Sequence, residues 1–173
     1  MPRIVMIIAS SLFRDEELFD TKAQLEKDGH EVTVASSRSG MCDGSRGGSA
    51  KAEITLDEIN TEETDALVFV GGPGASEYFE NMTAHRLAGE MLSSERILAA
   101  ICIAPVILAK ARLLKGRRAT VFSSGANVIE ENGAVYTGED VTADGNLVTG
   151  NGPASAVEFA QKISELLAKQ QDS

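Results

Sequence analysis

The sequence predicts an α/β protein with a mostly parallel central sheet. Short, unbroken apolar runs recur along the chain, and segments with the apolar spacing of a helix alternate with them. Central strands of parallel sheets are apolar on both faces because helices cover both sides. With 173 residues, 43% of them hydrophobic, the chain is long enough for a continuous core. We therefore expect one domain, residues 1–173.

The strands are predicted from runs of apolar or β-branched residues. They are residues 4–9, 30–35, 52–56, 66–70, 97–101 and 119–122. Toward the C-terminus, Val135 with Tyr136 and the stretch 141–149 around an Asp-Gly turn predict a small antiparallel ribbon. Residues 10–14 are expected to be a loop. The stretch 36–50, rich in Gly and Ser, is predicted to be an irregular surface loop in which Cys42 is exposed.

Helices are expected between most of these strands. The first begins with the acidic residues 15–17 and ends at Gly29. Another covers residues 84–92, and a third follows Pro105. A short helix ends near Glu131, and a final helix after Pro153 places apolar residues at helical spacing, so that it covers the sheet.

Cys102 lies where an apolar strand stops and a helix is about to begin. Pro105 follows three residues later, and proline is favoured in the first turn of a helix. Ala100 and Ala104 flank the cysteine at the spacing of small residues in a nucleophile elbow. A helix that starts here points free N–H groups at the sulfur, so we expect a stabilised thiolate and a lowered thiol pKa. The alternative for such a position is a buried, inert cysteine.

Two further features also follow apolar strands. Glu17 comes after the first strand, and the Gly71-Gly72 loop comes after residues 66–70. The carboxyl ends of parallel strands share one edge of the sheet, so these residues and Cys102 are predicted to meet in one cleft.

In this cleft Cys102 is the candidate nucleophile, and the N–H groups of Gly72 and Ile103 are the candidate oxyanion hole. A carboxyl group beside a thiolate avoids a second negative charge, so we expect Glu17 to hold its proton and to act as the general acid and base. The glycine loop and the loop before the last helix supply two candidate substrate-binding residues, Gly71 and Asn151.

Composition argues against several functions. The net charge of −10 and the lack of a basic patch oppose binding to nucleic acid or to an anionic membrane. Two isolated histidines and two distant cysteines do not have metal-ligand spacing, and Glu77 replaces the third glycine of a dinucleotide fingerprint. We therefore expect neither metal nor cofactor. The chain shows no signal-peptide pattern, so we expect a cytoplasmic protein with reduced cysteines.

Taken together, five segments resemble the ThiJ/PfpI superfamily, which contains the parkinsonism-associated protein deglycase and the PfpI endopeptidases. The segments are residues 15–18, 28–32, 71–72, 100–105 and 144–149, and the match covers nearly the whole chain. The resemblance implies a flavodoxin-like three-layer sandwich and a homodimer or larger homo-oligomer. It also implies a reactive cysteine supported by a buried glutamate, which correspond to Cys102 and Glu17.

The sequence departs from the superfamily in its histidines. Peptidase-like members place a histidine directly after the cysteine, where this chain has Ile103, and the deglycase branch has one near the position of Phe122. The remaining histidines, His30 and His85, lie in segments that are not expected at the site.

We therefore favour an enzyme of the glyoxalase or deglycase type, which acts on small reactive carbonyls or glycated protein through Cys102 and Glu17. One alternative is a non-catalytic oxidation sensor or stress-protective binding protein, in which Cys102 is oxidised to a sulfinate. The other is an intracellular cysteine peptidase or amidase, which requires a histidine from a neighbouring subunit.

Overall fold

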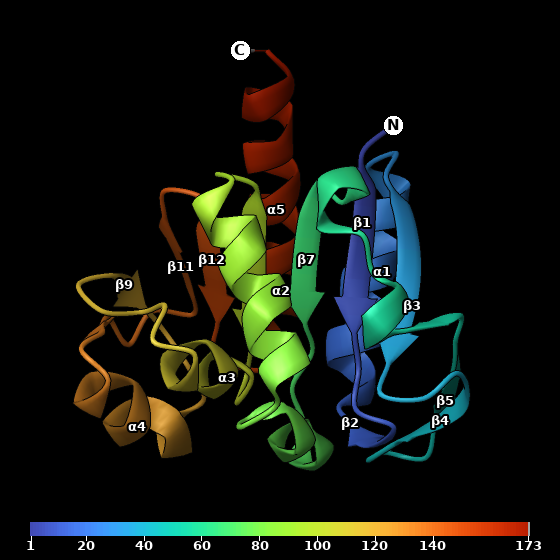
Figure 1. The fold of residues 1–173 in the computed structure, drawn as a ribbon, viewed down its shortest axis with the longest axis horizontal. Coiled ribbons are helices and arrows are strands. Elements are labelled where there is room, and N and C mark those ends of the chain that lie inside the picture. The colour runs from blue at the N-terminus through green and yellow to red at the C-terminus, as the bar shows by residue number, and fades with distance from the viewer. Residues whose placement is uncertain (173) are drawn as a thin grey trace.

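A parallel sheet forms the middle layer of the fold. The computed structural model describes residues 1–172, and within them seven strands form the main sheet (Figure 1). They are β1 (Arg3–Ile7), β3 (Glu31–Ser36), β6 (Ile54–Thr55), β7 (Ala66–Phe69), β8 (Ile97–Ile101), β11 (Val141–Asp144) and β12 (Leu147–Gly150). Their order is β11-β12-β8-β7-β1-β3-β6, and the pair β11/β12 is the antiparallel exception. The predicted α/β class with a mostly parallel sheet is confirmed.

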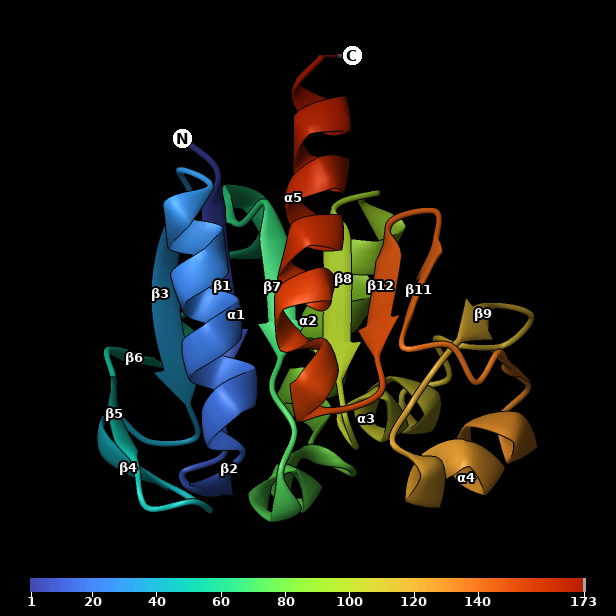
Figure 2. The ribbon, with the colours of Figure 1, turned by 180° about the vertical axis from the view of Figure 1, so that it is seen from behind.

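Helices cover both faces of the sheet. One face carries α1 (Asp15–Lys27) and α5 (Ala156–Gln171), and Figure 2 shows these two helices in front of the strands. The other face carries α2 (Met82–Ser93) and α3 (Pro105–Lys110), with α4 (Ala126–Glu131) packed against α3 (Figure 1). None of the helices among the described residues is long and apolar enough to cross a membrane.

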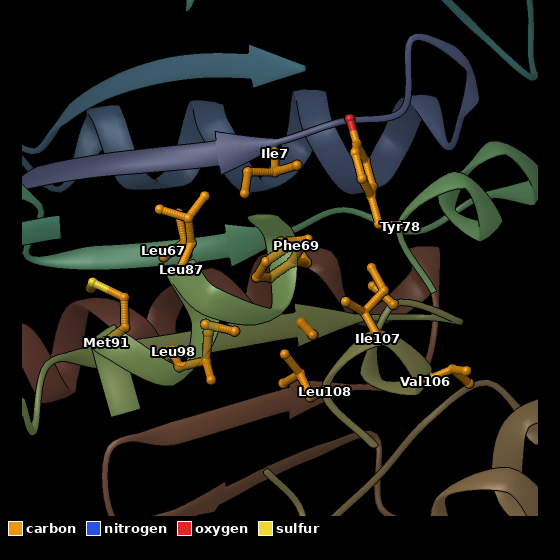
Figure 3. Packing of buried hydrophobic residues seen from close by; sticks show 14 of the residues in the cluster. Ile7, Leu67, Phe69, Tyr78, Leu87, Met91, Leu98, Val106, Ile107 and Leu108 are labelled. Atoms are coloured by element: carbon orange, nitrogen blue, oxygen red, sulfur yellow. The ribbon is translucent and has the colours of Figure 1, made fainter. Parts of the chain in front are cut away.

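The two core layers follow from the alternation of side chains along each strand. In β1, Ile4 and Met6 belong to the cluster that contains residues of α1 and α5, whereas Val5 and Ile7 belong to the cluster that contains residues of α2 and α3. Figure 3 shows the second cluster, in which Ile7 and side chains of β7 and β8 face those of α2 and α3. Burial on both faces explains why these strands read as unbroken apolar runs.

A second, smaller sheet was not expected from the sequence. It contains β2 (Ser11–Phe13), β4 (Gly40–Gly44) and β5 (Ser49–Ala52) in the order β2-β4-β5, so the loops predicted over 10–14 and 36–50 are wrong in part. The turn between β4 and β5 is held from outside, because the Asp15 carboxylate accepts the N–H groups of Arg46 (2.9 Å) and Gly48 (2.7 Å). Cys42 in β4 is fully buried, so its predicted exposure is wrong as well.

The C-terminal strands also differ from the predicted ribbon. β11 and β12 do form an antiparallel pair around Gly145, which has a positive φ of 61°, but β12 joins the main sheet in parallel with β8. Val135 and Tyr136 form β10 (Val135–Tyr136), which pairs in parallel with β9 (Arg118–Ala119) in a separate sheet. The predicted Asp-Gly turn is therefore confirmed, whereas contacts between residues distant in sequence determine which strands pair.

Tyr78 ties the segment after the Gly71-Gly72 loop to the ends of β1 and β3. Its buried hydroxyl donates to the carbonyl oxygen of Ile8 (2.7 Å) and accepts the N–H of Ser37 (3.0 Å), and burial raises its pKa to about 12. In Figure 3 the hydroxyl lies beside the end of β1.

Replacing Tyr78 with Phe is expected to lower the free energy of unfolding by about 1–3 kcal/mol, because the change leaves buried polar groups without a partner. Urea titration followed by circular dichroism measures this loss. Tyr136→Phe is the matched control, because no hydrogen bond of the Tyr136 hydroxyl is found among residues 1–172, and we expect a change below about 0.5 kcal/mol. Equal losses in both variants would contradict the role given to Tyr78.

Candidate active site

Cys102 sits at a tight corner between β8 and α3. Its φ is 64°, a left-handed conformation that residues with a side chain seldom adopt. The backbone is fixed on both sides, because the Cys102 N–H donates to the Gly150 carbonyl oxygen (2.9 Å) and the Cys102 carbonyl oxygen accepts the Phe122 N–H (2.7 Å). Strained backbone of this kind persists only where neighbouring structure holds it, and it is concentrated at functional sites.

Glu17, in the first turn of α1, lies against Cys102 with no solvent exposure. Its Oε1 accepts the N–H of Gly71 (3.0 Å), and its Oε2 has no nitrogen or oxygen partner among residues 1–172. The carboxyl group lies next to the Cys102 side chain, because Glu17 Oε1 and Cys102 Cβ both border the same space at Gly71. Burial raises the pKa of Glu17 to about 7, because water no longer stabilises the carboxylate.

The pKa of the Cys102 thiol is also raised, to about 12. Burial is the main cause, followed by the negative charge of Glu17. The N–H groups of Ile103 and Gly72 oppose this effect, because they hydrogen-bond the sulfur and stabilise a thiolate. The lowered thiol pKa expected from the sequence is therefore wrong: α3 has only six residues, and its dipole does not outweigh the loss of water around the sulfur.

The two groups are best understood as one pair that shares a proton. Between the two pKa values, about 7 and about 12, the pair holds a single proton and carries one negative charge. When this proton is on Glu17, the sulfur is a thiolate that Gly72 and Ile103 stabilise. The geometry can thus present a nucleophile and a general acid side by side.

The Cys102 side chain faces a cavity of about 420 Å³ at the carboxyl ends of the parallel strands. The wall is mainly apolar and aromatic, and among the described residues Arg14 is its one charged side chain apart from the titratable thiol. The lining residues are Arg14, Gly72, Pro73, Ser76, Phe79, Cys102, Ile103, Phe122, Ser124 and Pro153. Cys102 is therefore open to a ligand, and a largely apolar cavity with few polar groups is the usual form of a small-molecule site.

Two of the sequence-predicted residues lie outside this wall. The Asn151 side chain donates to Asp140 (3.1 Å) and accepts the Ser155 hydroxyl (2.7 Å), so its polar groups are engaged away from the cavity. Gly71 contacts Glu17 and does not line the cavity. Neither placement favours the substrate-binding role that the sequence suggested.

Gly71 instead provides the space in which Glu17 and Cys102 meet. A Cβ atom at this position would lie 2.6 Å from Glu17 Oε1 and 2.7 Å from Cys102 Cβ, which is closer than real Cβ atoms come. Glycine is thus required here for close approach, and its N–H serves to orient the carboxyl group.

Gly71→Ala is expected to separate Glu17 from Cys102. We expect it to lower the free energy of unfolding by about 1–3 kcal/mol through overpacking, and to speed Cys102 alkylation by iodoacetamide at pH 8 about tenfold, because the negative charge of nearby Glu17 raises the pKa of the thiol. Gly89→Ala in α2 is the control, because a Cβ atom added there would meet no neighbouring group within 4 Å. If alkylation of Gly71→Ala matched that of the wild type, the close approach would not matter for the thiol.

The histidines lie away from the sulfur. His30 Nε2 is 3.0 Å from the Ser164 hydroxyl, on the side of α1 and α5, and His85 Nε2 is 2.8 Å from the carbonyl oxygen of Phe79, behind the cavity wall. Neither lines the cavity. Arg14 and Phe79 are among the cavity residues that were not predicted from the sequence. Arg14 could have been found as a cation in the loop after the first strand.

A three-layer α/β fold with a cysteine at the corner after a central strand, in contact with a buried glutamate, defines a class of flavodoxin-like proteins with a cysteine-centred site. The chain belongs to the DJ-1/PfpI family, because the model of that family matches residues 2–166. This confirms the family that the sequence resembles.

Similar proteins cover almost the whole chain. "Deglycase PfpI" of Pyrococcus furiosus is 32% identical over 163 residues, which are 94% of this chain and 98% of that protein. Among solved structures, a ThiJ/PfpI domain protein from Brachyspira murdochii has a TM-score of 0.94 and 31% identity, with 96% of each chain covered. DJ-1beta of Drosophila melanogaster has a TM-score of 0.87 and 30% identity, with 97% of this chain and 91% of the other covered.

Proposed function

We propose that this protein is an enzyme of the glyoxalase or deglycase type, which acts on reactive 2-oxoaldehydes or on their adducts with proteins. The observation that carries the proposal is the pair of Glu17 and Cys102, which lie next to each other beside a cavity that can admit a small molecule. The similarity to a protein named deglycase over nearly the whole chain supports it.

The residues present suffice for the conversion of methylglyoxal and water to lactate. The Cys102 thiolate forms a bond to the aldehyde carbon, and the aldehyde oxygen takes the proton of Glu17, which gives a hemithioacetal and leaves a Glu17 carboxylate. Negative charge develops on the substrate oxygen during this step. The N–H groups of Gly72 and Ile103, which lie near the sulfur, can stabilise that charge.

Glu17 then serves as base and acid in turn. Its carboxylate removes the hydrogen from the former aldehyde carbon as a proton, and the electron pair of that C–H bond moves into the adjacent carbonyl group. The proton returns to that neighbouring carbon, and the hydroxyl proton of the former aldehyde oxygen moves to the neighbouring oxygen, which gives a lactoyl thioester on Cys102. Water hydrolyses the thioester, which releases lactate and restores the thiol, so no oxidant or reductant is consumed.

The test is turnover of methylglyoxal by the purified protein in a buffer free of thiols and amines, both of which react with aldehydes. We expect loss of methylglyoxal with formation of an equal amount of lactate over many turnovers. A protein that converts neither methylglyoxal nor a methylglyoxal-treated peptide would overturn the proposal.

One observation favours a second function, an oxidation sensor. The Glu17 Oε2 atom is buried without a nitrogen or oxygen partner among the described residues, and a protonated Glu17 can donate a hydrogen bond from it to a sulfinate on Cys102. Graded treatment with hydrogen peroxide, followed by mass spectrometry, is expected to add two oxygens to Cys102 before the buried Cys42 reacts. Earlier oxidation of Cys42 would rule this function out.

A peptidase is less well supported. Neither histidine of the chain lies at the cavity, so a Cys-His pair needs a histidine from a second copy of the chain.

A further inference from the structure

We propose that Arg14 makes this site selective for 2-oxoaldehydes that carry a carboxylate, with the carboxylate bound by the guanidinium group and the aldehyde carbon at Cys102. The inference rests on the proposed function and names its substrate class. The size of the cavity, the charge within it and the hydrogen bonds of Arg14 support it.

The charge of the cavity is opposite to that of the whole chain. The protein carries a net charge of −10, yet Arg14 is the one charged side chain among the described lining residues apart from the titratable thiol. Its side chain is 24% exposed and forms an ion pair with Glu16, which lies outside the lining residues. A cation in an apolar wall attracts an anionic group into that wall.

Hydrogen bonds to Glu16 hold the guanidinium group of Arg14 in place, and several of its N–H groups make no hydrogen bond to residues 1–172. Its Nε and Nη2 atoms donate to the same oxygen, Glu16 Oε2, at 3.0 and 2.7 Å. An arginine has five N–H donors, and no other hydrogen bond of this side chain is found among residues 1–172. The edge between Nη1 and Nη2 therefore remains available for two parallel hydrogen bonds to a carboxylate.

Arg14 is also fixed relative to the reacting sulfur. Its backbone N–H donates to the Gly71 carbonyl oxygen (2.9 Å), and the N–H of Gly71 in turn holds Glu17, which contacts Cys102. The hydrogen bond to Glu16 is the main cause that raises the pKa of Arg14, and negative charge on Glu16, Glu17 and Cys102 contributes to the same rise. An anion bound by Arg14 is thus within electrostatic reach of the reaction.

The size of the cavity fits a substrate longer than methylglyoxal. A volume of about 420 Å³ accommodates several carbon atoms beyond a three-carbon aldehyde. Phe79, Phe122 and Pro153 provide apolar surface for methylene groups between the aldehyde and the carboxylate. A compound of this kind is 4,5-dioxopentanoate, whose conversion consumes one water and yields 2-hydroxyglutarate.

The first test does not depend on turnover. The alkylation rates of Cys102 by iodoacetate, an anion, and by neutral iodoacetamide are compared, with mass spectrometry to exclude reaction at Cys42. We expect the rate with iodoacetate divided by the rate with iodoacetamide to fall about fivefold to tenfold in Arg14→Gln. A change of this size is the effect of removing one partly screened positive charge. Arg3→Gln, at the opposite end of β1, is the control for net charge and should leave the ratio unchanged. An unchanged ratio in Arg14→Gln would overturn the proposal.

The second test compares substrates. For 4,5-dioxopentanoate, kcat/KM is expected to fall about tenfold to a hundredfold in Arg14→Gln, mainly through KM, and to recover in part in Arg14→Lys. For the neutral 2-oxopentanal, of the same chain length, kcat/KM should change less than about threefold.

Equal losses of kcat/KM for both substrates would show that Arg14 is structural and would contradict the inference. If wild type converts no carbonyl, the proposed function fails, and the alkylation ratio still decides whether Arg14 selects anions.

Discussion

Replacing Cys102 with Ala or Ser is expected to lower methylglyoxal turnover at least about 10³-fold, because the variant lacks the atom that bonds to the substrate. Serine is an informative substitute, because it is similar in size but its hydroxyl holds its proton far more tightly than a thiol does. Glu17, with a pKa of about 7, is too weak a base to remove that proton. Disappearance of methylglyoxal and appearance of lactate measure the loss, and circular dichroism checks the fold.

Cys42→Ala is the control for this experiment. Cys42 is fully buried in the core beneath α1 and does not line the cavity. We expect a loss of about 1 kcal/mol in the free energy of unfolding and unchanged turnover per folded molecule. If Cys102→Ala retained turnover that Cys42→Ala lost, the nucleophile would have been assigned to the wrong sulfur.

The main sheet could be predicted from the sequence because both of its faces are buried. Runs such as residues 4–9 and 97–101 have no polar residue to place on a solvated face, and this pattern is specific to central parallel strands. The smaller sheet lacked such a pattern. Its strands β4 and β5 are rich in Gly, Ser and charged residues, and backbone pairing and the Asp15 carboxylate hold them in place. Contacts of this kind leave no periodicity in the sequence.

The sequence predicts those parts of the candidate site whose positions follow from the topology of the sheet. Because parallel strands end at one edge, Glu17, Gly72 and Cys102 were expected together, and the structure brings them together. The direction of the thiol pKa shift depended on how deeply the sulfur is buried, which a sequence does not give. Asn151 was placed on the right edge of the sheet, but its side chain is engaged by Asp140 and Ser155.

Glu17→Gln is expected to slow turnover about 10²-fold to 10³-fold, because glutamine can accept the N–H of Gly71 but cannot transfer a proton. In the wild type, kcat/KM should rise as the pH passes through about 7, where the pair of Glu17 and Cys102 loses its first proton. The variant should lack this step. Rates of methylglyoxal loss between about pH 5.5 and 9 would show it, and a step near pH 7 that persists in Glu17→Gln would have to come from another group.

The same substitution should change how stability depends on pH. The pKa of Glu17 is raised from 4.5 to about 7, so the folded state binds a proton that the unfolded state releases. The stabilisation from this proton is fully present below about pH 4.5 and is lost as the pH rises through about 7, a change of about 3 kcal/mol.

Urea titrations at several pH values should show this decline in the free energy of unfolding of the wild type and a flatter curve for Glu17→Gln. Glu16→Gln is the control, because Arg14 lowers the pKa of Glu16 and its contribution has the opposite sign. Parallel curves for the wild type and Glu17→Gln would mean that Glu17 is not the buried proton carrier on which the chemistry depends.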